Sequence, residues 1–205
     1  MRLILAILAT LALAQCITPA DDDRFRVGAE ENALVIIGMA ESARDTSPEF
    51  KMLWRLLDEH GNWTRYGPRT ILETETNSGS SVRIGGIPGE FYIVELEPGV
   101  YALDSVFATI RDRRVNYIAQ GVIVGPERPS FQVRAGEAVY LGIWEMDLEE
   151  TTAVARPWRM DEDDLRRVLS EADPVIGGVT FRQAQPRNVP CTPRLLSSMS
   201  QRQAC

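Results

Sequence analysis

Histidine and cysteine are scarce in this sequence of 205 residues, which contains one histidine and three cysteines. A single histidine, His60, excludes a metal site built from two or three imidazoles, and with it zinc hydrolysis by a His-Glu-x-x-His helix. The sequence also lacks the Gly-x-Ser-x-Gly elbow, the phosphate loop, the Gly-x-Gly-x-x-Gly turn and the Cys-x-x-Cys pair. It therefore predicts no metal and no cofactor, and it identifies no catalytic residue.

Long hydrophobic runs are also missing, apart from one at the N-terminus. Residues 3–13 are apolar except for Thr10, and Arg2 is the only charge before Asp21. A membrane-spanning helix needs about 20 apolar residues, so this run is too short to cross a bilayer. It is typical of a cleavable signal peptide, which we assign to residues 1–15.

The residues Leu13-Ala14-Gln15-Cys16 resemble the lipobox of bacterial lipoproteins. In that family the cysteine is acylated and becomes the first residue of the mature protein, so the resemblance implies a lipid anchor on Cys16. Gln15 departs from the pattern, which prefers Gly or Ala before the cysteine. Ala12-Leu13-Ala14 also offers an ordinary secretory cleavage site before Gln15, so a soluble periplasmic protein is the alternative.

The number of cysteines favours the lipid anchor. An odd count leaves one reactive thiol in an oxidising compartment, and acylation of Cys16 would consume it. Cys191 and Cys205 can then form a disulfide, closing a loop worth roughly 3 kcal/mol in the chain-entropy model. The alternative is that these two are unrelated thiols.

The charge of the chain limits its partners. The net charge of −7 repels phosphate backbones and anionic lipid headgroups, so we expect no nucleic acid and a membrane contact made by acyl chains alone. Residues 16–30, with Asp21, Asp22 and Asp23, are predicted to form a flexible linker. Ile17, directly after the cysteine, favours the outer membrane over the inner one by the sorting tendency of the lipoproteins that the leader resembles. The predicted location is the cell envelope, facing the periplasm.

From residue 31 to residue 159 the chain consists of short apolar segments separated by Gly, Pro, Asn and Asp. This spacing predicts a mainly β domain, and about ten strands are too many for one sheet, so we expect a two-sheet antiparallel β-sandwich. A turn at residues 58–62 should join two of the segments in a hairpin. The predicted strands are 33–40, 52–57, 63–66, 70–76, 81–84, 90–96, 101–110, 115–124, 130–134, 138–146 and 151–158.

Pro98 and Gly99 predict a tight turn before Tyr101, either a hairpin or a corner that crosses between sheets. The sequence from Leu96 to Tyr101 is similar to the tyrosine corner of fibronectin-type sandwiches, and to the Leu-x-Pro-Gly-x-Tyr turn of transthyretin-like and carboxypeptidase-regulatory-like domains. The resemblance implies that the Tyr101 hydroxyl bonds back to backbone just upstream.

Residues 131–144 alternate in polarity, with Val139, Leu141 and Ile143 on one face and Tyr140 and Trp144 on the other. Together with the leader and the Pro-Gly-x-Tyr turn, this run is similar to a group of uncharacterised bacterial lipoproteins. That resemblance implies a fold and a location, and it supplies no catalytic residue. Tyr140 and Trp144 are candidates to line a ligand groove, although aromatic residues at alternating strand positions more often belong to the core.

Residues 160–205 are predicted to form one helix and a loop-rich tail. Asp161 is a good N-cap, Pro174 ends the run, and an apolar face that includes Leu165 and Val168 should pack on the sandwich. Residues 179–181 are expected to add an edge strand.

Two functions remain open. The first is a noncatalytic envelope lipoprotein whose sandwich binds a protein or a cell-envelope component. The alternative is a secreted hydrolase that uses carboxylates such as Asp58 and Glu59 beside His60, and it requires a cleft around them. The acidic group Asp147, Glu149 and Glu150 lacks the spacing of a calcium loop and is interpreted as a solvated strand end.

Overall fold

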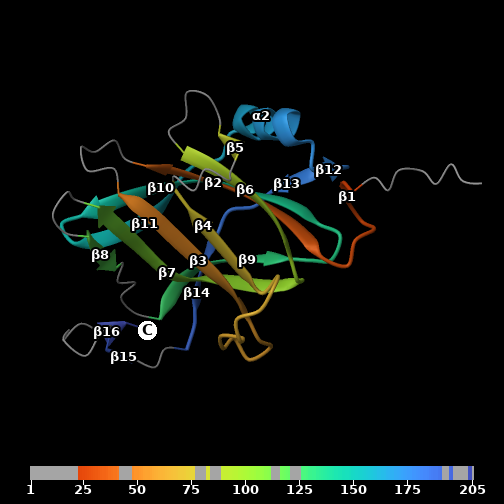
Figure 1. Cartoon of the computed structure of the whole chain (residues 1–205). Helices are drawn as coiled ribbons and strands as arrows, with labels where there is room; N and C mark the ends of the chain where they lie inside the picture. The colour runs from red at the N-terminus through yellow and green to blue at the C-terminus, as the bar shows by residue number, and fades with distance from the viewer. Residues whose placement is uncertain are drawn as a thin grey trace, which may run out of the picture.

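Short β-branched segments form two sheets that pack face to face, with one helix on the outer side of the first sheet (Figure 1). The computed structural model describes residues 23–41, 48–76, 82–83, 89–111, 116–120, 126–190, 194–195 and 203–204. The prediction of a mainly β sandwich is confirmed. Among the described residues, no helix is both long and apolar enough to cross a bilayer.

The first sheet is built around two central strands, β10 and β2. Its strands, in spatial order, are β11 (Thr152–Arg159), β10 (Ala138–Glu149), β2 (Ala33–Glu41), β6 (Gly89–Leu96) and β5 (Val82–Arg83), with β13 (Val179–Phe181) beside β10.

The second sheet is built around β7, which pairs with β3 on one flank. Its strands, in spatial order, are β14 (Gln185–Asn188), β9 (Glu127–Val133), β7 (Gly99–Arg111), β3 (Glu49–Leu57) and β4 (Ile71–Glu75), with β8 (Asn116–Gln120) beside β7. Strands β13 and β14 follow the helix in sequence, so the two sheets include residues beyond 159.

Two short pairs lie outside the main sheets. Strand β1 (Phe25–Arg26) pairs in parallel with β12 (Val175–Ile176), and β15 (Arg194–Leu195) pairs with β16 (Gln203–Ala204). Phe25, within the segment predicted as a flexible linker, is 4% exposed and packs near Leu34 and Ala138. The chain is therefore tied to the sandwich from Phe25 onward.

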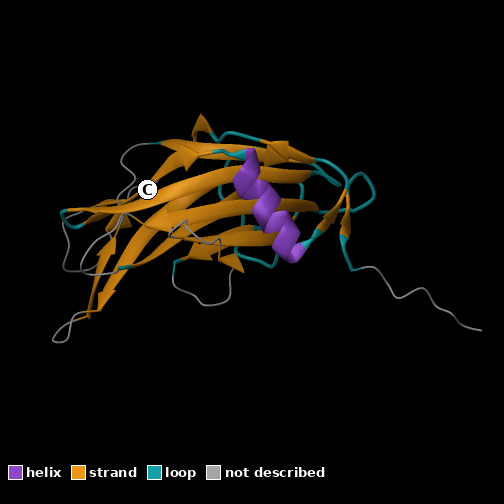
Figure 2. Ribbon diagram, turned by 90° about the horizontal axis from the view of Figure 1, so that it is seen from above, coloured by secondary structure: helices purple, strands orange, loops and turns teal. Residues whose placement is uncertain are grey.

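The first sheet is mixed rather than purely antiparallel. Strand β10 runs parallel to β2 and to β13, whereas the other pairs within the two sheets are antiparallel. Strand β2 reads Ala-Leu-Val-Ile-Ile-Gly-Met-Ala before its final Glu41, and these eight residues are buried. A strand covered on both faces has this nearly continuous apolar sequence. The second sheet covers one face of β2, and the helix lies across the other (Figure 2).

The helix α2 (Glu162–Ala172) forms as the sequence predicts. Asp161 caps it, because its side chain accepts a hydrogen bond of 2.7 Å from the backbone N–H of Asp163. Leu165 and Val168 are 5% and 0% exposed and pack with Tyr140 on the outer side of the first sheet. Docking on the sheet supplies the stability that a helix of this length lacks alone in water.

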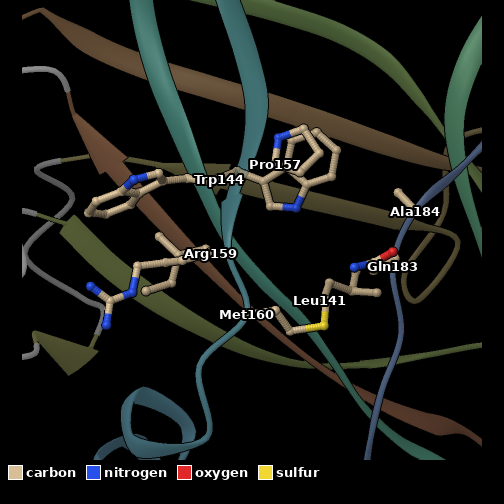
Figure 3. Close-up of a pocket in the computed structure, with 9 residues that line it drawn as sticks. Leu141, Trp144, Pro157, Arg159, Met160, Gln183 and Ala184 are labelled. Atoms are coloured by element: carbon tan, nitrogen blue, oxygen red, sulfur yellow. The ribbon is translucent and has the colours of Figure 1, made fainter.

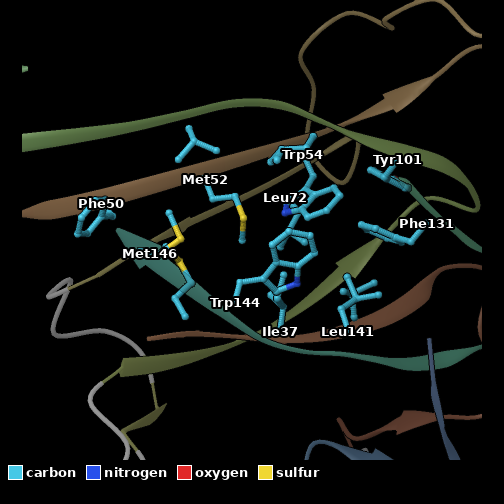
Figure 4. Close-up of a cluster of buried hydrophobic side chains, with 14 of the residues drawn as sticks. Ile37, Phe50, Met52, Trp54, Leu72, Tyr101, Phe131, Leu141, Trp144 and Met146 are labelled. Carbon is cyan, nitrogen blue, oxygen red and sulfur yellow. The ribbon is translucent and has the colours of Figure 1, made fainter. Parts of the chain in front are cut away.

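Two tryptophans join the sheets across the core (Figure 4). Trp54 comes from β3 and Trp144 from β10, and their ring centroids are 5.1 Å apart at 81°. Phe131 of β9 packs edge to face on Trp54 at 5.2 Å and stacks on Tyr101 at 5.4 Å. Aromatic pairs in these geometries contribute about 0.5–1.5 kcal/mol each beyond the area they bury.

The strand predicted at 63–66 is wrong. Trp63 makes only an isolated bridge to Leu57, and β3 pairs instead with β4, after the loop. The Asp58 carboxylate accepts hydrogen bonds from the N–H groups of His60 and Asn62, at 2.9 and 2.8 Å, which closes a tight local turn. The chain then leaves the ladder and covers the outer side of β3.

The turn at Pro98 and Gly99 is a corner between sheets, because β6 belongs to the first sheet and β7 to the second. The Tyr101 hydroxyl lies 2.9 Å from the carbonyl oxygen of Glu97 and 2.8 Å from that of Arg69, and it donates its proton to this pair. The tyrosine-corner bond is therefore confirmed, and it also holds the 58–70 loop. Burial raises the pKa of Tyr101, so the hydroxyl stays a donor at physiological pH.

We predict that Tyr101→Phe lowers the free energy of unfolding by about 1–3 kcal/mol, because two backbone carbonyls lose their shared donor. Tyr140→Phe is the matched control: its hydroxyl is buried and has no hydrogen-bond partner among the described residues. Its removal should be neutral or stabilising within about 1 kcal/mol. Urea unfolding of both variants measures the difference between their free energies of unfolding. Equal losses of stability in the two variants would contradict the assignment of the tyrosine corner.

Candidate binding pocket

Strand β10 has three partners, and two of them share one flank. Strand β11 pairs with residues 143–149 of β10, and β13 pairs with residues 138–140. Because β11 is antiparallel and β13 parallel to β10, both run toward the same point and end there. We name the region around Leu141 and Gly142, where the two strands stop, the β10 junction.

Two bulges meet at the β10 junction. Opposite β2, Leu141 and Gly142 occupy the place of the single residue Ile37, and Gly142 has φ of +77°. Opposite β11, Trp158 is the extra residue between Pro157 and Arg159. Bulges of this kind bend a strand and redirect its side chains.

The bulge at Gly142 changes which face each side chain occupies. Before it, Tyr140 lies under α2 and contacts the rings of Phe91 and Phe181. After it, Trp144 lies between the sheets, against Trp54. The prediction that Tyr140 and Trp144 share a face is therefore wrong, and the two are 0% and 1% exposed in separate apolar clusters.

A pocket of about 310 Å³ opens at the β10 junction (Figure 3). This volume is at the lower end of the range for small-ligand sites. The lining residues come from both bulged strands and from the link between β13 and β14: Leu141, Ile143, Trp144, Pro157, Trp158, Arg159, Met160, Gln183 and Ala184. Of the two predicted groove residues, Trp144 lines this pocket and Tyr140 does not.

The link between β13 and β14 crosses from the first sheet to the second and closes one side of the pocket. The Arg182 N–H donates to the Tyr140 carbonyl at 3.0 Å, which continues the β13 ladder. The Arg182 guanidinium donates to Glu137 Oε2 at 3.0 Å and also to the carbonyl of Gln132. Burial alone would raise the pKa of Glu137, but hydrogen bonds from Arg182 and Arg134 outweigh it and lower the pKa. Ala184 then packs against the core.

The only charged residue that lines the pocket is already neutralised. Arg159 Nη2 lies 2.7 Å from Oδ2 of Asp164, which is 1% exposed, and 3.8 Å from Asp161 Oδ2. The same guanidinium lies over the ring of Trp158, 5.4 Å from its centroid. The pocket therefore suits an uncharged group that has both apolar and polar parts, and Trp158, 48% exposed, forms its rim.

The carboxylates proposed for hydrolysis do not form a site. Asp58, Glu59 and His60 lie in an exposed turn, and none of them lines the pocket. The His60 ring is 3.4 Å from Glu59 with both side chains at least 75% exposed. A hydrogen bond from the Asn62 N–H, supported by one from His60, lowers the pKa of Asp58, as expected for a turn-stabilising carboxylate. The geometry gives the hydrolase prediction no support.

Of the remaining predicted residues, some are ion-paired and others lie outside the described part of the chain. Asp147 and Glu149 are ion-paired with Arg156 along the β10–β11 pair. In the described part of the chain, no group of three His, Cys, Asp or Glu side chains could hold a metal ion. The predicted lipidation residue Cys16 and the predicted disulfide Cys191–Cys205 lie outside the described residues.

Gly142 should be the residue on which the pocket depends. A Cβ at this position would lie 2.7 Å from the Arg159 carbonyl oxygen, in a backbone conformation that L-residues rarely adopt. We predict that Gly142→Ala lowers the free energy of unfolding by at least about 2 kcal/mol. Gly61→Ala is the control, since Gly61 has a similar φ of +80° and open space around its Cβ position; it should cost about 1 kcal/mol. Equal losses in denaturant unfolding would show that the junction tolerates the extra methyl group.

Comparisons with known proteins leave the family open. No protein-family model matches the chain, and no curated protein matches it. A crystal structure of a putative cell adhesion protein from Bacteroides ovatus ATCC 8483 is similar over 64% of this chain, with 10% sequence identity and a TM-score of 0.29. The match covers 47% of that protein, so the chain spans about half its length. At this TM-score the likeness carries no argument about function.

Proposed function

We propose that this chain is an exported lipoprotein, anchored in the cell envelope through Cys16, whose sandwich binds a protein or another envelope component without catalysing a reaction. The observation that carries the binding role is the pocket at the β10 junction. Its lining combines apolar side chains with polar groups, its one charged residue is paired with Asp164, and an exposed tryptophan stands at its rim.

The strands and the link that line the pocket are held in place by hydrogen bonds before any partner binds. Its floor comes from β10, and its sides come from β11 and from the link that Arg182 holds in place. A partner group that enters would therefore gain apolar contact without ordering the protein first. Tryptophan is one of the residue types enriched among those that dominate binding energy at interfaces, once a partner buries it.

The lipid anchor is inferred from the lipobox-like sequence. The fold limits how far the sandwich can lie from the acylated Cys16. The chain joins the sandwich at Phe25, so eight residues separate Cys16 from the first strand. An extended chain spans at most about 3.3–3.6 Å per residue, so this tether reaches about 30 Å. The acyl chains would hold the β1–β12 end of the sandwich close to the bilayer, with the outer membrane as the proposed location.

The anchor is tested by the intact mass of the mature protein purified from bacterial envelope. We expect a chain that begins at Cys16 and carries the mass of fatty acyl groups, because the acylated cysteine is the first mature residue of the lipoproteins that the leader resembles. Cys16→Ser should lack the acyl mass and leave the membrane fraction. A mature chain that begins at Gln15 without acyl mass would contradict the anchor and support the soluble alternative.

The binding role is tested by replacing Trp158. We expect Trp158→Ala to weaken the affinity for the envelope partner by at least about tenfold, because loss of a buried aromatic anchor typically costs that much. The partner is captured from envelope extracts with the full mature chain, identified by mass spectrometry, and titrated against each variant.

Ile176→Ala is the matched control, since Ile176 is an exposed apolar residue, 39% accessible, that does not line the pocket. It should bind as tightly as the wild type. Unchanged affinity of Trp158→Ala for the partner would show that binding does not use the pocket.

A further inference from the structure

The outer face of the second sheet carries two arginines around one aspartate. Arg55 lies on β3, Asp104 on β7 and Arg128 on β9, which are neighbouring strands. Asp104 is the extra residue of a bulge, because Leu53 pairs with Ser105 and Trp54 pairs with Leu103. Tyr101 and Leu103 face the core, so the alternation of β7 places the Asp104 side chain on the outer face, next to the two arginines. We name Arg55, Asp104 and Arg128 the arginine triad.

Two rings from the 58–70 loop hold Arg55 in position. Its guanidinium carbon lies 4.7 Å from the centroid of Trp63 and 4.8 Å from that of Tyr66. The Tyr66 hydroxyl donates to Asp104 Oδ2 at 3.2 Å, so this ring is also fixed at its far end. Rings cover the faces of a guanidinium, whereas its N–H donors lie in its plane and point outward at its edge.

Among the described residues, few groups accept hydrogen bonds from the donors of the triad. Arg55 Nη1 is 3.8 Å from Asp104 Oδ2, which is too long for a hydrogen bond, and Arg55 Nε is buried without a partner among the described residues. Arg128, 2% exposed, donates one bond of 3.4 Å, to the carbonyl of Asp104. Each guanidinium has five N–H donors, so the described residues accept one of the ten.

The charge of the triad is also unbalanced. Two guanidinium groups face one carboxylate, and among the described residues no second carboxylate lies within ion-pair distance of either arginine. Side-chain exposure is 13% for Arg55 and 6% for Asp104, so water compensates only part of the excess positive charge. Burial lowers the pKa of Arg128, although the Asp104 charge opposes this effect. Buried charges of this kind are normally paired.

We propose that the arginine triad is a binding site for one carboxylate group of a ligand, which accepts hydrogen bonds from the in-plane donors of Arg55 and Arg128. A single negative charge balances the excess of one positive charge, whereas a phosphate dianion would overcompensate it. A polyanion would meet the repulsion of a chain with net charge −7. The Tyr66 ring lies beside Arg55, and the residue is 60% accessible, so this side of the triad faces solvent.

The site is tested by titrating the full mature chain with sodium acetate at constant ionic strength, and following the arginine side-chain N–H signals by NMR. We expect saturable shifts of the Arg55 and Arg128 signals. Arg55→Gln should weaken acetate binding by at least about tenfold, since it removes a charge-assisted donor. Arg156→Gln, which changes an exposed arginine paired with Glu149, should bind acetate as the wild type does.

Asp104→Asn distinguishes a ligand site from a structural cluster. It preserves an acceptor for Tyr66 but raises the excess charge, so acetate should bind at least about threefold more tightly. A purely structural triad would lose stability in this variant without gaining affinity. Inorganic phosphate at equal ionic strength should bind no more tightly than acetate.

The proposal is overturned if acetate gives no saturable shift, if Asp104→Asn binds no more tightly than the wild type, or if phosphate is preferred. None of these results involves Trp158, so they leave the proposed binding role of the pocket unaffected. That role is tested only by the Trp158→Ala experiment.

Discussion

A β-strand has two hydrogen-bonding flanks, and β10 has three partners. One flank is taken by β2, so β11 and β13 must divide the other between them. Where they stop, the ladder is interrupted, and the bulges at Gly142 and Trp158 absorb the mismatch. The link after β13 then has to leave the first sheet, and it crosses to the second, where β14 pairs with β9. The pocket is the space that these constraints leave.

The sequence predicted those features whose causes lie within a few residues of one another. Asp161 and Pro174 bound the helix, and Pro98, Gly99 and Tyr101 specify a corner with a hydroxyl bond to Glu97, only four residues upstream. Most strands could be predicted from the sequence, because alternating polarity and turn residues are local signals. The predicted strand at 63–66 failed because alternation continues there, while a bond network around Asp58 takes the backbone out of the ladder.

The candidate sites could not be predicted, because they depend on contacts between distant segments. An isolated glycine within an apolar strand is a signal for a bulge, and Gly142 is such a residue. That signal does not say which neighbour the bulge faces, so the change of face between Tyr140 and Trp144 was missed. The arginine triad joins residues 24 to 73 positions apart in the sequence, on three neighbouring strands, and no local pattern indicates which strands become neighbours.

Both candidate sites use the same device on opposite sides of one core. In the first sheet, two bulges meet at the pocket next to Trp144, and in the second, Asp104 is itself the extra residue of a bulge and lies next to Arg55 and Arg128. Trp144 packs on Trp54, which precedes Arg55 in sequence, so a short route through the core links the sites. Closely packed interiors have few alternative arrangements, and these tryptophans are at most 1% exposed. Both sites therefore depend on the same packed tryptophan pair, and contacts of this kind are where the effects of two substitutions stop being additive.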